Sequence, residues 1–137
     1  MTMTRVELSD SELRFLRAAM LEWSGSSAPT DGLALALGFA DADSLSRQTW
    51  TLWQRIERAE ELSAGEWRRV LLAAEVVFVS DVVGSGLDWS VTTGITDAQA
   101  LATLRGLQGK LPRRRGNGRF TVLDGGEVAV ADPERTD

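Results

Sequence analysis

The most hydrophobic stretch of the chain covers residues 70–83 and is interrupted by only three polar residues. Ser63 and Glu66 precede it with the spacing of a capping box, in which a serine hydroxyl and a glutamate carboxylate satisfy free N–H groups at the start of a helix. The apolar residues that follow cover most of the helical circumference, as in a buried helix. The Gly-Ser-Gly segment at 84–86 then supplies an end, because glycine adopts the left-handed turn after a helix without a Cβ penalty. We therefore predict a buried central helix over residues 64–84.

A strand at residues 76–79 is the alternative interpretation of this stretch, because four consecutive β-branched or aromatic residues also suit a buried strand. The capping box and the Leu-Leu-Ala-Ala run at 71–74 favour the helix, since leucine and alanine are strong helix formers. Ionised carboxylates leave water only when they are paired or hydrogen-bonded. We therefore expect Glu75 and Asp81 to reach the rim of the core or to pair with an arginine.

Similar patterns predict helices on both sides of the central one, with two further capping boxes and apolar residues at helical spacing. The expected helices run from Ser9 to about Gly25, over residues 32–37, from Asp43 or Ser44 to about Leu62, and from Thr96 to about Lys110. Residues 87–93 are expected to form a loop or a short extended stretch, and residues 5–8 an extended lead-in. The sequence therefore predicts an all-α fold, a bundle-like domain of four to five helices within residues 1–111.

The composition changes after this domain, and residues 112–137 are expected to be a basic hinge followed by a hairpin-like tail rather than an independent domain. Two short β-prone segments at 120–123 and 127–130 flank an Asp-Gly-Gly turn. A lone two-stranded hairpin is marginally stable in water. We therefore expect it to dock on the helical body, on a partner or on a second copy of the chain, and a homodimer through the hairpin is one such arrangement.

The residue types that are missing restrict the chemistry of the chain. It contains no histidine, cysteine or tyrosine and a single lysine, Lys110. Ser-His-Asp and Cys-His nucleophilic sites, thiolate metal sites and most zinc-hydrolase sites are therefore excluded. We predict a protein that is not an enzyme and that has no cofactor and no metal site.

The arginine content and the hydropathy of the chain suggest its source and its cellular location. Fourteen arginines against one lysine indicate the codon usage of a GC-rich bacterial genome. The first residues contain no apolar leader segment, and the longest apolar runs carry charges and are too short to cross a bilayer. We therefore expect a cytoplasmic protein without membrane contact.

Charge patterning suggests the kind of partner. Residues 1–110 hold 10 basic and 15 acidic side chains, a net charge of −5, which disfavours nonspecific binding to nucleic acid and favours a basic partner. The leading prediction is a noncatalytic protein-binding module, in one form an immunity or antitoxin-like inhibitor. The candidate contact residues are Trp50, Asp81, Asp88 and Trp89. For Trp50 we prefer a place at the margin of the core over an exposed partner contact.

Two alternatives remain open from the sequence. The first is a small nucleic-acid-associated regulator, because guanidinium groups match phosphate oxygens and the basic patch offers Arg113, Arg114, Arg115 and Arg119. The preferred interpretation of this patch is a solvated arginine-rich hinge that pairs with the acidic face of the domain. The second alternative is a carboxylate-based, metal-dependent enzyme with a site at Glu75, Asp81 and Asp88.

Overall fold

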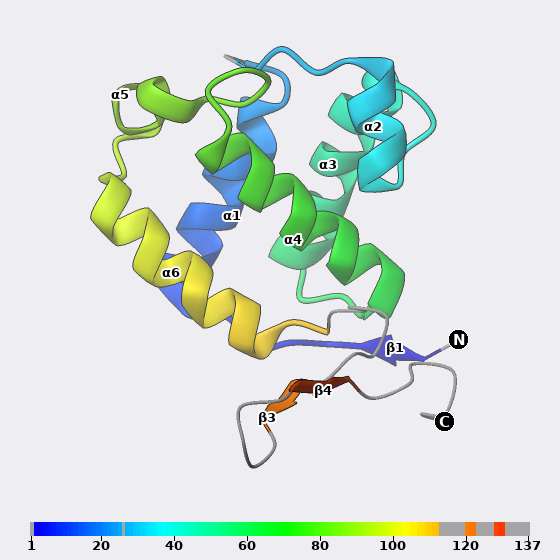
Figure 1. The fold of residues 1–137 in the computed structure, drawn as a ribbon. Helices are drawn as coiled ribbons and strands as arrows, with labels where there is room; N and C mark the ends of the chain where they lie inside the picture. The colour runs from blue at the N-terminus through cyan, green and yellow to red at the C-terminus, as the bar shows by residue number, and fades with distance from the viewer. Residues whose placement is uncertain (1, 26, 113–119, 123–127, 131–137) are drawn as a thin grey trace.

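The computed structural model describes residues 2–25, 27–112, 120–122 and 128–130, and this part of the chain is mainly helical (Figure 1). The predicted all-α class is therefore confirmed. The helices are α1 (Asp10–Glu22), α2 (Asp31–Leu37), α3 (Ala42–Glu57), α4 (Ala64–Val79), α5 (Trp89–Thr93) and α6 (Asp97–Lys110), with a 3-10 turn η1 (Gly86–Asp88) before α5. The strands are β1 (Met3–Thr4), β2 (Leu62–Ser63), β3 (Phe120–Val122) and β4 (Val128–Val130). Within the described ranges, no helix has the length and apolar character needed to cross a bilayer.

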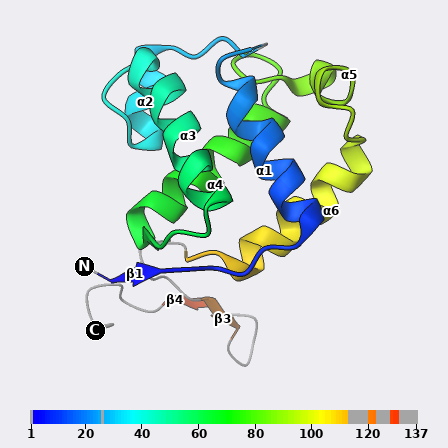
Figure 2. The same cartoon turned by 180° about the vertical axis from the view of Figure 1, so that it is seen from behind.

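Helix α4 is the centre of the domain, as the hydrophobic stretch predicts. It contacts α1, α2, α3 and α6, and it crosses the front of the molecule in Figure 1, whereas Figure 2 shows α1 and α3 on the opposite side. Its buried residues are Trp67, Val70, Leu71, Ala73, Ala74 and Val77. The helix forms in place of the alternative strand because its inward face packs against four other helices, which a single strand could not do.

Helix α4 is shorter than predicted, because it ends at Val79 with Ser80 as its C-cap rather than at residue 84. The backbone of Ser80 is extended, and its hydroxyl accepts a hydrogen bond from the N–H of Val83. Asp81 accepts one from the N–H of Leu87 through its carboxylate. Short polar side chains that bond to nearby backbone groups compete with a helix. The glycines at 84–86 therefore lie in a return turn and do not end the helix.

Helix α3 also ends early, at Glu57 instead of about residue 62. Ala59 has a left-handed backbone with φ of 57°, and the N–H of Glu60 bonds to the carbonyl of Arg55 at 3.0 Å. This is the arrangement of a Schellman cap, which usually contains glycine at the left-handed position. The end was missed because alanine occupies that position here.

Two segments predicted to be extended or irregular have a different structure. Residues 87–93 are helical, in η1 and α5, because Trp89 is drawn into the core. Residues 5–8, expected to be an extended lead-in, form no strand, and the N-terminal strand β1 lies just before them and pairs antiparallel with β2. The predicted hairpin is confirmed as the antiparallel pair β3 and β4, whereas its Asp-Gly-Gly turn lies outside the described residues.

All three predicted capping boxes are present, at Ser9/Glu12, Ser63/Glu66 and Thr96/Gln99. In two of them the glutamate also holds a cation from another segment. Lys110 at the end of α6 lies 2.6 Å from Glu12, and Arg55 of α3 lies 2.5 Å from Glu66. Each glutamate therefore joins the start of its own helix to a second helix.

These contacts set the ionisation of both glutamates. Burial raises the pKa of Glu12, but hydrogen bonds from Lys110 and Ser9 and the charge of Lys110 lower it by more, so the pKa lies below its ordinary value of 4.5. Burial also raises the pKa of Glu66, and hydrogen bonds from Ser63 and Arg55 with the charge of Arg55 again give a net lowering from 4.5.

We expect the double variant Glu12→Gln/Glu66→Gln to lose part of the acid dependence of stability. A carboxyl whose pKa is lowered by folding stabilises the protein above the unfolded-state pKa, and the effect is lost as the pH falls from about 4.5 through the folded-state pKa. The check is the free energy of unfolding in urea between pH 7 and pH 3. Glu57→Gln changes an exposed glutamate and should follow the wild-type curve, whereas a double variant that also follows it would contradict the prediction.

Candidate functional site

Exposed apolar side chains gather in one part of the sequence. Seven large apolar residues of the described chain are exposed, and five of them lie between residues 79 and 101: Val79, Val82, Leu87, Val91 and Leu101. Single exposed apolar residues are ordinary, but a group of them on one surface marks an interaction site. The C-terminal end of α4 and the segments that follow it are therefore the candidate site.

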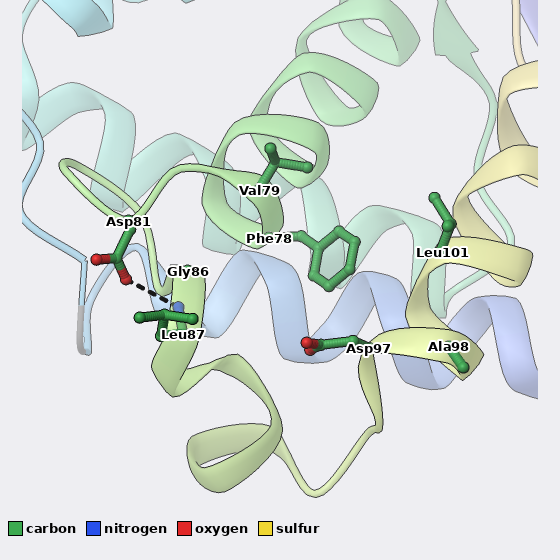
Figure 3. A pocket seen from close by; sticks show the side chains of 8 residues that line it. All are labelled: Phe78, Val79, Asp81, Gly86, Leu87, Asp97, Ala98 and Leu101. Carbon is green, nitrogen blue, oxygen red and sulfur yellow. Dashed lines mark hydrogen bonds between the residues drawn. The ribbon is translucent and has the colours of Figure 1, made fainter.

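A groove of about 390 Å³ lies at this position, between the end of α4, the turn before α5 and the first turn of α6 (Figure 3). It is lined by Phe78, Val79, Asp81, Gly86, Leu87, Asp97, Ala98 and Leu101. Three of these, Val79, Leu87 and Leu101, are among the exposed apolar residues, so the groove has an exposed apolar rim. The two charged lining residues, Asp81 and Asp97, are both acidic. We call this the α4/α6 groove.

The apolar side of the groove rests on a cluster of three aromatic rings. The ring of Phe78 meets that of Trp89 edge-on at a centroid distance of 5.3 Å, and Phe15 of α1 lies 5.4 Å from Trp89. Edge-to-face contacts of this kind fix the relative orientation of the rings. Trp89 is completely buried, so it supports Phe78 from inside the core.

The turn that carries Leu87 to the groove is held by its own polar groups. The carboxylate of Asp81 accepts a hydrogen bond from the N–H of Leu87 at 2.8 Å (Figure 3). Gly86 has a left-handed backbone with φ of 46°, and a Cβ at this position would lie 2.4 Å from the Cα of Asp81. The turn therefore requires a glycine here, and Asp81 has a structural role as well as a place in the lining.

A buried carboxylate fastens the segment after this turn to α1. Glu22 at the end of α1 accepts hydrogen bonds from the hydroxyls of Ser85, at 2.7 Å, and Thr92. The N–H of Ala28 also bonds to the carbonyl of Val83 at 2.9 Å. Buried polar groups with satisfied hydrogen bonds favour one arrangement of the segments that they join. The η1–α5 segment is thus positioned by α1 rather than being a free loop.

The other carboxylate of the lining, Asp97, occupies the first turn of α6 next to the N-cap Thr96. Negative charge is favoured at a helix N-terminus by the free N–H groups and by the helix dipole. Asp97 is exposed and so remains accessible to a partner.

Of the four predicted contact residues, one lines the groove and a second is the chain neighbour of a lining residue. Asp81 lines the groove, and Asp88 is exposed beside Leu87 in η1. The prediction of Trp89 as a contact residue is wrong for this structure, because its indole is fully buried. Trp50 lies on α3, half-buried against the core, which confirms the core-margin interpretation and separates it from the groove.

The two acids of the central stretch differ in their surroundings. Asp81 reaches the surface, as predicted. Glu75 is half-buried, and the partner that the structure gives it is the side-chain amide of Gln108, at 2.6 Å, rather than an arginine. Among the described residues there is no group of three or more carboxylates that could hold a metal ion, so Glu75, Asp81 and Asp88 do not form the cluster of the enzyme hypothesis. The basic patch Arg113, Arg114, Arg115 and Arg119 lies outside the described residues.

Most of the groove was not predicted from the sequence, including Phe78, Val79, Leu87, Asp97 and Leu101. One signal was available for Leu101. The buried residues at this end of the chain, Ala100, Leu104, Leu107 and Leu111, alternate at spacings of four and three, as the core face of a helix does. Leu101 lies outside this alternation and is 47% exposed.

The described chain therefore presents an apolar groove with acidic residues in its lining, stiffened by aromatic packing and by a buried carboxylate. Comparisons with protein-family models, with curated proteins and with solved structures give no match.

Proposed function

We propose that this protein is a noncatalytic protein-binding module that holds its partner in the α4/α6 groove. The observation that supports this proposal is the exposure of Val79, Leu87 and Leu101 around one hollow, at 69%, 83% and 47%. Exposing such side chains to water is unfavourable, and their burial against a partner would be a source of binding free energy.

The charge of the chain supports a basic partner. Asp81 and Asp97 line the groove, Asp88 lies next to Leu87, and the whole chain has a net charge of −5. Complementary charge speeds the encounter of two proteins and suppresses wrong partners. A cytoplasmic inhibitor of the immunity or antitoxin type, which would cover the basic surface of its target, is the form of this function that we favour.

The proposal is tested by comparative capture from an extract of the native cells. The baits are the purified chain, the variant Leu87→Ser/Leu101→Ser and the control Leu35→Ser. Leu35 is an exposed leucine on α2, so its replacement changes surface hydrophobicity away from the groove. We expect a protein that the wild type and the control retain, and that the groove variant retains about tenfold less, as for the loss of an interface hot spot. A partner retained equally by all three baits, or none retained by any of them, would refute the proposal.

A further inference from the structure

The shape of the α4/α6 groove indicates the backbone conformation of its occupant. Its lining comes from the ends of two helices and from the turn between Asp81 and Leu87, and none of the lining residues belongs to a strand. An extended peptide would find no strand edge with which to pair, and its N–H and C=O groups would lie over apolar side chains. A helix satisfies these groups internally and needs only side-chain contacts.

The lining also indicates which side chains the occupant presents. Its apolar members call for apolar residues on one face of the bound helix, at a spacing of three and four. Asp81 and Asp97 call for basic residues beside that face, since the lining contains no basic residue. A carboxylate has about four acceptor positions, so Asp81 can bond to Leu87 and still accept from a guanidinium.

Other occupants fit these observations less well. Small-molecule sites enclose most of the ligand surface, whereas the rim residue Leu87 is 83% exposed and the groove is open. A second copy docked symmetrically would place the same surface against itself, so that one acidic lining would meet another with no basic residue between them.

We propose that the α4/α6 groove binds an amphipathic helix of a partner protein, with apolar residues along one face and arginine or lysine beside them. This inference depends on the proposed protein-binding function and specifies the chemistry of the partner. The bound helix inserts its apolar face between Leu87 and Leu101, and its basic residues meet Asp81 and Asp97.

The experiment is a selection of peptides of about 16 residues, roughly four helical turns, from a random display library against the purified full chain. We expect the enriched peptides to carry apolar residues at helical spacing with adjacent arginine or lysine. The affinities of the enriched peptides are then measured by fluorescence anisotropy at low and moderate salt. The chains compared are the wild type, Leu87→Ser, Asp97→Asn and the controls Leu35→Ser and Glu57→Gln.

Leu87→Ser should weaken binding about tenfold, as at an interface hot spot. Asp97→Asn should weaken it about two- to threefold and reduce its salt dependence, as a rim charge does. The controls should bind like the wild type. Enriched peptides that are acidic, that alternate in the pattern of a strand, or that bind Leu87→Ser unchanged would overturn the inference.

A selection that enriches no peptide would also overturn it, as would self-association of the chain that Leu87→Ser abolishes, because the occupant would then be a second copy. The capture experiment tests the proposed protein-binding function independently of the peptide selection. If native capture remains sensitive to Leu87→Ser/Leu101→Ser while the peptide selection fails, the protein-binding function stands and the helical occupant does not.

Discussion

Replacing Gly84 by alanine is expected to lower the free energy of unfolding by about 3 kcal/mol, the upper part of the range for overpacked sites. An added Cβ would lie 2.6 Å from the carbonyl oxygens of Val76 and Val77 and 2.7 Å from that of Ser80. All three are backbone atoms at the end of α4, so no flexible side chain can move aside to make room. The methyl group can be accommodated only if the return turn separates from the helix, and equilibrium unfolding in urea measures the cost.

Gly109 in α6 provides the matched control, because among the described residues a methyl group there would meet open space. Apart from its chain neighbours and the nearby backbone of its own helix, no atom of the described residues lies within 4 Å of a Cβ built at Gly109 in α6. Gly109→Ala should therefore raise the free energy of unfolding by about 0.5–1 kcal/mol, the usual difference between the two residues inside a helix. Equal effects of the two substitutions would show that the return turn is not held against α4.

Gly84→Ala also has a consequence for the proposed binding site. The turn that contains Gly84 carries Asp81 and Leu87, and both line the α4/α6 groove. A chain that remains folded with this turn displaced should lose affinity for the partner, whereas Gly109→Ala should keep it. Stability and binding are thus linked through one short segment.

Three helix starts could be predicted from the sequence, because a helix start depends on hydrogen bonds between residues three apart. Ser9, Ser63 and Thr96 each cap the helix that their spacing predicts. The start of α3 was predicted at Asp43 or Ser44, but the helix begins at Ala42 with Asp41 as its N-cap. The ends of α3 and α4 were missed because no glycine marks them. One depends on an alanine in a left-handed conformation at residue 59, and the other on local bonds of Ser80 and Asp81, neither of which a search for glycine detects.

The candidate site could be predicted only in part, because it depends on which apolar residues the rest of the chain leaves uncovered. Asp81 was identified from its unusual place in an apolar stretch, and it lines the groove. Trp89 was expected at the surface, but it is fully buried, whereas Leu87, two residues earlier, is 83% exposed. Local sequence offers no means of telling these two apart, since the difference arises from the packing of Trp89 against Phe15 and Phe78.

The packing of Trp89 leads to the second large effect. We expect Trp89→Ala to lower the free energy of unfolding by about 3–5 kcal/mol, the range for removing a large buried aromatic side chain. The indole is completely buried and contacts the rings of Phe15 and Phe78. Because Phe78 lines the groove, any folded fraction of this variant should also bind the partner more weakly.

Phenylalanine at the same position separates packing from hydrogen bonding. Trp67 is equally buried, but its indole N–H donates to the carbonyl of Thr4 at 2.9 Å, whereas that of Trp89 has no hydrogen-bond partner among the described residues. Trp67→Phe therefore loses a hydrogen bond as well as volume, and Trp89→Phe loses volume alone. We expect Trp67→Phe to be the more destabilising by about 1 kcal/mol, the net value of a typical buried hydrogen bond. Urea unfolding of the two variants provides the comparison. A greater destabilisation by Trp89→Phe would contradict this prediction. It would indicate that the indole N–H of wild-type Trp89 has a hydrogen-bond partner in solution.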